Sequence, residues 1–298
     1  MGITYPDAKM LWDARLRGAC FTDTITLGHL SLYLHPPDVA VLRRAYQATF
    51  SQSTVTPLDN YRFGDDSDEF LRGFLGVTAL AILDYSSYEG ANTVHDLNQP
   101  IPQNLCGRFD AVIDGGTLEH VFNFPVAIAN VMKMLRVGGT AFVTTPANNL
   151  CGHGFYQFSP ELMFRVFTRE NGFTLRRVTL VQAAYPSVER TPNRSVYEVT
   201  DPENARSRVG LVSRRPVIMM MEATKTDDRP LFTSPPLQSD YATRWEQGKT
   251  QSSQTRIRRM LGSLVNRLPA FLRARIMGYR EMRRYSFSNR RFYRRLHW

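Results

Sequence analysis

The stretch that decides the fold is FDAVIDGGTLEHVFNFPVAIANVMKMLRVGGTAFVTTPAN, residues 109–148. It begins with the apolar run FDAVI, which ends at Asp114 and is typical of a strand buried on both faces. The segment PVAIANVMKML then places apolar residues at helical spacing, and the glycine pair after it ends the helix. TAFVTT, stopped by a proline, is a second strand. This order of strand, helix and strand predicts a parallel βαβ unit.

The alternation continues on both sides of this unit. Before it, ALAIL at 79–83 is a buried strand that ends at Asp84. After it, a Ser-Pro-Glu start predicts a helix at 159–170, and β-rich segments follow at 173–181 and 216–223. The chain is therefore expected to form an α/β fold with a doubly wound, mainly parallel sheet. A long polar connection joins the last two strands, so they are expected to pair antiparallel at one edge.

Composition limits the class of protein. With 298 residues, 43% of them hydrophobic, the chain can bury a sizeable core. Its three cysteines (Cys20, Cys106 and Cys151) have no ligand spacing, which disfavours disulfides and structural zinc and predicts no metal site. No secretory signal or membrane-spanning run is apparent. These features favour a cytoplasmic protein.

The positive charge is concentrated at the C-terminus. Residues 251–298 hold 13 of the 37 basic residues and one acid, a formal charge of +12, whereas the first 250 residues carry −2. We therefore divide the chain into a domain (1–228), a linker (229–255) and a basic amphipathic tail (256–298). The tail suits a peripheral contact with an anionic membrane, and single-stranded nucleic acid less well. Alternatively, its apolar face packs on the domain.

Acidic residues follow the predicted strands. In doubly wound sheets, ligands bind beyond the carboxyl ends of the strands. Asp84, Asp96 and Asp114 occupy such positions, and a carboxylate can accept hydrogen bonds from two ribose hydroxyls at once. Gly115 and Gly116 would let a ligand approach the backbone closely. Each acid taken alone can also be an ordinary turn residue.

Residues 109–148, followed by FSPELMFRVFTRENGF, resemble the fourth-strand to fifth-strand region of class I S-adenosylmethionine-dependent methyltransferases. In that family a strand reading FDxV leads to LEHV, an amphipathic helix, a GG turn and a strand ending in TPN. The resemblance covers about residues 79–173 and implies a Rossmann-like fold with S-adenosyl-L-methionine as cofactor. The cofactor-binding residues that it implies are Asp84 for the ribose with Tyr85 beside it, Asp96 near the adenine amino group, Leu97 packed on adenine, and Asp114, Gly115 and Gly116 under the methionine part.

The glycine-rich loop of that family is degenerate here. Members usually carry E/DxGxGxG about twenty residues before the ribose-binding acid, and this sequence has no such cluster. Gly28 follows the strand-like DTITL, and a helix is expected at 36–48. The stretch at 63–66 (FGDD) is better spaced but follows a poor strand. We favour Gly28 as the cofactor-binding glycine, although one glycine allows less backbone contact than three.

Candidate catalytic residues lie in two segments. His153, in CGHGFYQF after the fifth-strand region, can serve as a base for a hydroxyl acceptor, with Tyr156 and Gln157 orienting that acceptor. A histidine between glycines can also simply support a turn. Glu119 and His120 in LEHV are expected mainly to fix a helix start, and Glu119 is a second catalytic candidate. The hydrolase GxSxG and the P-loop motif are absent.

The sequence therefore predicts an S-adenosylmethionine-dependent methyltransferase that acts on a small molecule or a glycan. The alternative is a non-catalytic binding module that kept the fold and lost the glycine loop.

Overall fold

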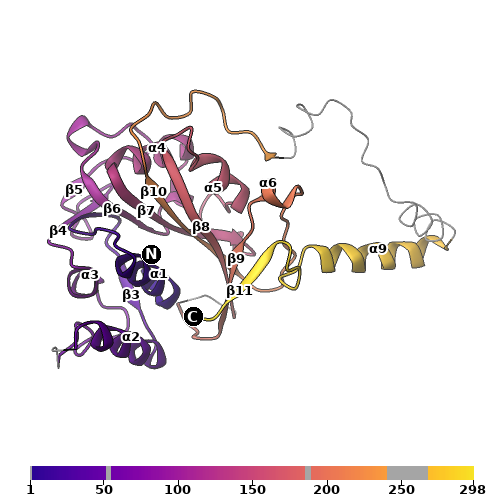
Figure 1. Cartoon of the computed structure of the whole chain (residues 1–298), viewed down its shortest axis with the longest axis horizontal. Helices are drawn as coiled ribbons and strands as arrows, with labels where there is room; N and C mark the ends of the chain where they lie inside the picture. Colours follow the sequence, from indigo (N-terminus) through magenta and orange to yellow (C-terminus); the bar gives the residue numbers. More distant parts are fainter. Residues whose placement is uncertain (1, 52–54, 185–188, 240–267) are drawn as a thin grey trace.

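The computed structural model describes residues 2–51, 55–184, 189–239 and 268–298, and its centre is a nine-stranded sheet (Figure 1). Five strands run parallel and lie in the order β7-β6-β2-β4-β5. This confirms the predicted α/β fold with a mainly parallel sheet. The parallel strands are β2 (Asp23–Leu27), β4 (Ala79–Asp84), β5 (Thr93–Val94), β6 (Phe109–Gly115) and β7 (Leu135–Asn148).

The sheet continues beyond β7 with antiparallel pairs. β10 (Val217–Lys225) lies between β7 and β8 (Phe173–Ala183) and is antiparallel to both. The expected antiparallel pairing is therefore present, but it lies inside the sheet and not at its edge. The sheet extends past β8 because two further strands add to it, β9 (Arg194–Val199) and β11 (Tyr293–Leu296).

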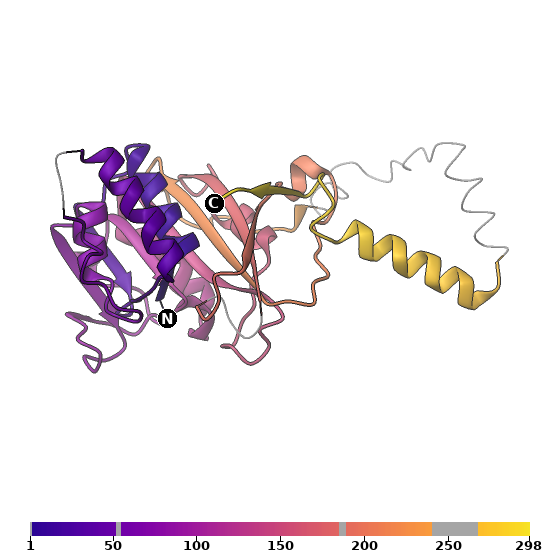
Figure 2. The same ribbon diagram turned by 90° about the horizontal axis from the view of Figure 1, so that it is seen from below.

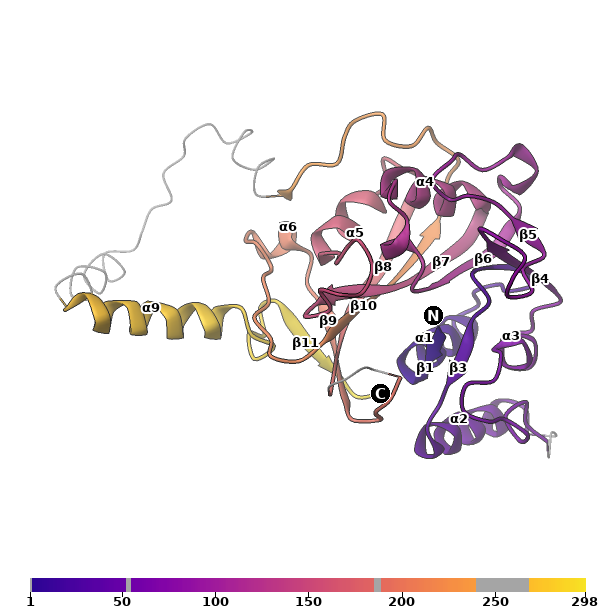
Figure 3. The same cartoon turned by 180° about the vertical axis from the view of Figure 1, so that it is seen from behind.

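Helices cover both faces of the sheet, with a separate apolar core under each set (Figure 3). On one face lie α4 (Phe124–Met134) and α5 (Pro160–Val166); on the other lie α1 (Tyr5–Leu16), α2 (Pro36–Thr49) and α3 (Asp68–Leu75). The remaining short elements of the body are a two-stranded parallel sheet of β1 (Gly2–Thr4) and β3 (Ser31–Tyr33), the 3-10 turns η1 (Gln103–Leu105) and η2 (Leu118–His120), and α6 (Pro202–Ala205).

The strand predicted from DTITL is present as β2. β2 pairs with β4 on one side and β6 on the other, and Gly28 follows it directly. Gly28 has a φ of 76°, a left-handed conformation that favours glycine. The LEHV segment differs from the expectation, because it forms the turn η2 and α4 begins only after Asn123.

The C-terminal residues do not form one tail outside the domain. β11 pairs antiparallel with β9, with Tyr293 opposite Val199, and Phe292 is buried in the core beside it. The predicted boundary at residue 228 is therefore wrong for the last residues, because they complete the sheet. The predicted linker lies partly, and the apolar pattern at 257–265 wholly, outside the described residues.

Helix α9 (Ala270–Arg284) points away from the body of the protein (Figure 2). None of its residues is buried. In the described part of the chain, no helix combines the length and the apolar character that crossing a bilayer requires.

Candidate functional site

Three of the predicted cofactor residues lie at the carboxyl ends of adjacent strands of the sheet. Leu27, the last residue of β2, lies opposite Leu83 in β4 and opposite Asp114 in β6. The backbone N–H of Gly28 donates a hydrogen bond of 2.7 Å to the carbonyl of Leu83. Gly28, Asp84 and Asp114 are thus brought side by side at the carboxyl ends of the parallel strands, where doubly wound sheets bind ligands.

Asp84 ends β4, and Asp96 lies two residues after the end of the neighbouring strand β5. One carboxylate oxygen of Asp84 accepts a hydrogen bond of 2.6 Å from the backbone N–H of Tyr85. Asp96 follows β5, the strand beside β4, and accepts backbone and side-chain hydrogen bonds from Asn98. These hydrogen bonds hold the pKa of Asp96 below its usual value, so the carboxylate is charged at neutral pH.

The side chains of Tyr85 and Leu97 lie in opposite environments. Tyr85 is 74% exposed, whereas Leu97 is buried in the core under α4. The backbone carbonyl of Leu97 accepts a hydrogen bond of 3.3 Å from the buried Asn130 side chain. Leu97 therefore helps to anchor the segment after β5 to α4.

A cavity of about 670 Å³, including its open mouth, lies beyond the ends of β6 and β7. Gly116, Glu119 and His153 line it from the two loops that follow these strands. The N-terminal segment lines another wall, with Thr4 and Asp7. The other lining residues are Gly2, Gly115, Thr144, Thr145, Pro146, Leu150, Ala183, Glu189, Pro216 and Ile218.

Glu119 lines this cavity, and Asp114 is a second buried acid near it. One oxygen of Asp114 accepts hydrogen bonds from the backbone N–H groups of Gly116 (3.1 Å) and Thr117 (2.7 Å). Burial nevertheless raises the pKa of Asp114 to about 7. Burial, and next the negative charge of Asp114, raise the pKa of Glu119 to about 8. Within the described residues, the second oxygen of each carboxyl group is buried and has no hydrogen-bond partner.

The loop that carries His153 is fixed against η2. The backbone N–H groups of Phe155 and Tyr156 donate to the carbonyl of Glu119, at 2.8 and 3.2 Å. Gly154 has a φ of 79°, and a Cβ there would lie 2.8 Å from the same carbonyl oxygen. As a result, Nε2 of His153 lies 3.4 Å from Oε1 of Glu119. The structure thus brings the two predicted catalytic residues together.

Tyr156 and Gln157 do not face an acceptor as the sequence suggested. The Tyr156 hydroxyl donates to the carbonyl of Phe122 at 2.7 Å, and the Gln157 side-chain oxygen accepts from the backbone N–H of Leu150 at 2.9 Å. Both side chains therefore support the surrounding loops.

The contribution of the N-terminal segment was missed from the sequence. Asp7 accepts hydrogen bonds from the backbone N–H of Thr4 (2.8 Å) and from the hydroxyl of Thr144 (2.6 Å), and its burial raises its pKa. The Thr4-Tyr5-Pro6-Asp7 pattern was a usable signal, because a capping residue, a proline and an acid in that order mark a helix start. Gly115 permits the close approach of this segment, since a Cβ there would lie 3.3 Å from the carbonyl oxygen of Gly2.

No protein-family model and no curated protein matches the chain. Similar solved structures include an S-adenosylmethionine-dependent methyltransferase from Thermotoga maritima, at 12% identity over 73% of this chain and 89% of that one, with a TM-score of 0.38. A second is the 1,6-didemethyltoxoflavin-N1-methyltransferase of Burkholderia thailandensis with bound S-adenosylhomocysteine, at 13% identity over 75% and 78%, TM-score 0.36. A third is a branched-chain polyamine synthase of Thermus thermophilus with bound 5′-methylthioadenosine, at 13% identity over 79% and 61%, TM-score 0.36.

These solved structures include the class that the sequence resembles, S-adenosylmethionine-dependent methyltransferases. Because these similarities are distant, our description of the fold rests on the strand order of this chain. Our description of the site rests on the positions of its own residues.

Proposed function

We propose that the chain is an S-adenosylmethionine-dependent methyltransferase whose cofactor lies across the carboxyl ends of β4, β2 and β6. The observation that carries this proposal is the register that sets Gly28, Asp84 and Asp114 side by side. Asp84 binds the ribose hydroxyls and Asp96 lies toward the adenine. Gly116 lines the cavity at the end of β6, where the methionine part and the reactive methyl group would face the acceptor.

The acceptor side of this proposed site is the cavity beyond β6 and β7. A small molecule or a sugar is compatible with its mixed polar and apolar lining. Transfer is an in-line displacement: a lone pair of the acceptor attacks the methyl carbon while the carbon–sulfur bond breaks and its electrons remain on sulfur. Holding the two reactants in line supplies most of the rate enhancement. A chain that binds the cofactor at this edge without transferring methyl groups would instead be the non-catalytic module.

Replacing Asp84 by alanine tests the cofactor site. The variant should bind S-adenosylhomocysteine about 1.5 to 3 kcal/mol more weakly, a loss of about 10- to 150-fold, because two charge-assisted hydrogen bonds to the ribose disappear. Titration calorimetry measures this difference. Asp228→Ala is the matched control, because Asp228 is exposed beyond the opposite end of the sheet, where it pairs with Lys225. Equal affinity of the Asp84 variant and the wild type would remove Asp84 from the site.

We further propose that helix α9 binds an anionic membrane surface. Phe271, Leu272, Ile276, Tyr279 and Met282 recur at short helical steps and are all at least 36% exposed. Arg273, Arg280 and Arg284 lie at steps of seven and four and so share another face. Arg275 and Arg283 lie among the apolar residues. Exposed apolar side chains combined with several arginines are typical of helices that lie in the plane of a membrane interface.

Removing charge from α9 should weaken this binding. Changing Arg273, Arg275 and Arg280 together to glutamine should weaken binding to phosphatidylserine vesicles by about 100-fold, since each basic residue contributes up to about 1 kcal/mol. Cosedimentation with vesicles measures it, and binding by the wild type should also fall as ionic strength rises. The control is the triple change of Arg44, Arg62 and Arg169, which removes the same charge from exposed positions on the body. Equal losses in both variants would mean that net charge, and not α9, drives the association.

A further inference from the structure

Glu119, His120 and His153 form a cluster beside the cavity, which Glu119 and His153 line. One possible ligand atom from each lies within 4.8 Å of the others. Glu119 and His120 come from η2, whereas His153 comes from the loop after β7, and the backbone hydrogen bonds to the Glu119 carbonyl hold these two segments together. The rings of the two histidines are 5.2 Å apart. Residues distant in sequence are thus fixed at one place by the main chain.

Among the described residues, no lysine or arginine balances the negative charge of the Glu119 carboxylate. Glu119 is 1% exposed, lines the cavity, and has a buried oxygen without a hydrogen-bond partner in the described part of the chain. Across the same described residues, its ion-pair contact is with His153, and no lysine or arginine pairs with it. Asp114 places a second buried carboxyl group near it. A buried acid with an unpaired oxygen is costly unless a proton or a cation compensates it.

We propose that Glu119, His120 and His153 bind a divalent transition-metal ion, of which zinc is the best match. Two imidazoles and one carboxylate are the three protein ligands of many catalytic zinc sites, which keep a further position open. Glu119 and His153 both line the cavity, so an ion held between them would lie at its wall, with the open position available to a ligand in the cavity. This differs from the expectation of no metal, which considered only the spacing of the cysteines.

To bind zinc at these three residues, the exposed side chain of His120 has to move slightly. Ligands bound to zinc at about 2.0 to 2.1 Å in a tetrahedral arrangement lie about 3.3 Å from one another. The Glu119 to His153 distance of 3.4 Å already meets this condition. The ring of His120 has to turn toward the other two ligands, and His120 is exposed. The buried member, Glu119, can remain where it is.

A metal ion at this place would determine which chemical class of compound receives the methyl group. This inference rests on the proposed methyltransferase function. The open position would bind the oxygen of a hydroxyl compound and lower its pKa, so that the proton leaves to water and the oxygen lone pair attacks the methyl carbon. The acceptor would therefore be an alcohol, a phenol or a sugar hydroxyl, and not an amine.

Titration of the chelator-treated full chain with zinc chloride tests the metal site. We expect one zinc ion per chain, and at least tenfold weaker binding for each of His120→Ala, His153→Ala and Glu119→Gln. His297→Ala is the matched control, because His297 is exposed at the C-terminus, and it should bind zinc as the wild type does. Cobalt(II) provides a second readout, since its visible spectrum in the wild type should be lost in the three variants.

Failure of this proposal is distinguishable from failure of the proposed function. If the wild type binds no zinc at about 100 µM, or if the three variants bind it like His297→Ala, the metal site is refuted. Affinity for S-adenosylhomocysteine, measured in the same proteins with and without chelator, reports on the cofactor site separately. Should Glu119→Gln fail to fold, the two exposed histidines still decide the question.

Discussion

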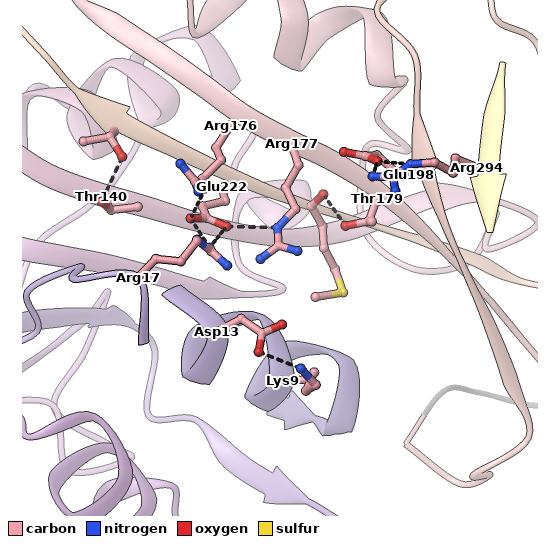
Figure 4. Close-up of polar contacts among 12 residues, drawn as sticks. Lys9, Asp13, Arg17, Thr140, Arg176, Arg177, Thr179, Glu198, Glu222 and Arg294 are labelled. Atoms are coloured by element: carbon pink, nitrogen blue, oxygen red, sulfur yellow. Dashed lines mark hydrogen bonds and ion pairs between the residues drawn. The ribbon is translucent and has the colours of Figure 1, made fainter. Parts of the chain in front are cut away.

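Replacing Glu222 by glutamine is expected to lower the free energy of unfolding by about 3 kcal/mol. Glu222 lies in the interior antiparallel strand β10 and is almost fully buried. Its two oxygens accept hydrogen bonds of 2.6 and 2.7 Å from Arg17 and one of 3.0 Å from Arg177, and Arg176 lies 3.6 Å away (Figure 4). Glutamine keeps the shape but leaves the guanidinium group of Arg177, itself mostly buried, without its counter-charge.

Urea denaturation of Glu222→Gln and of Glu198→Gln measures the effect. Glu198, on β9, pairs with the exposed side chain of Arg294, so its loss should cost less than about 1 kcal/mol. A change below 1 kcal/mol for Glu222→Gln as well would mean that desolvation cancels the attraction within the cluster.

The second large effect is expected at the C-terminus. Phe292→Ala should destabilise the fold by about 3 to 5 kcal/mol, because Phe292 is 2% exposed and packs in the core beside β11. Phe271→Ala, on the exposed α9, removes the same side chain and should change stability by less than about 0.5 kcal/mol. Thermal melting compares the two variants, and Phe292→Leu offers a milder change if Phe292→Ala does not fold.

Equal stability of the Phe292 and Phe271 variants would contradict the packing of Phe292 in the core. Membrane binding by α9 could also be tested by deleting residues 251–298. If the expected difference is found, that deletion would destabilise the fold as well, since it removes β11 together with α9. Point changes on α9 avoid this problem.

The parallel half of the sheet could be predicted because its strands carry their own signal. Strands buried on both faces are continuous apolar runs, and β4 and β6 each consist largely of such a run before an aspartate. The position of Gly28 could be predicted for a similar reason, since a strand-like segment and a helix start flank it. Asp84 and Asp114 could be predicted as the acids at the ends of these strands.

The sequence of β11, the strand at the edge of the sheet, carries no comparable signal. β11 reads YRRL, in which two arginines point to solvent, and it pairs with a strand more than ninety residues earlier. Pairing at that separation is decided by tertiary packing and not by local propensity. The Glu119 and His153 contact was unpredictable for the same reason, because it depends on how the loop after β7 folds back on η2.

Titration calorimetry of the wild-type chain with S-adenosylmethionine and S-adenosylhomocysteine tests the cofactor proposal most directly. We expect one site per chain for each compound, with a Kd below about 1 mM, and weaker binding for Asp84→Ala than for Asp228→Ala. Absence of heat, together with an unchanged melting temperature at millimolar concentrations of either compound, would contradict binding of this cofactor at the carboxyl edge of the sheet.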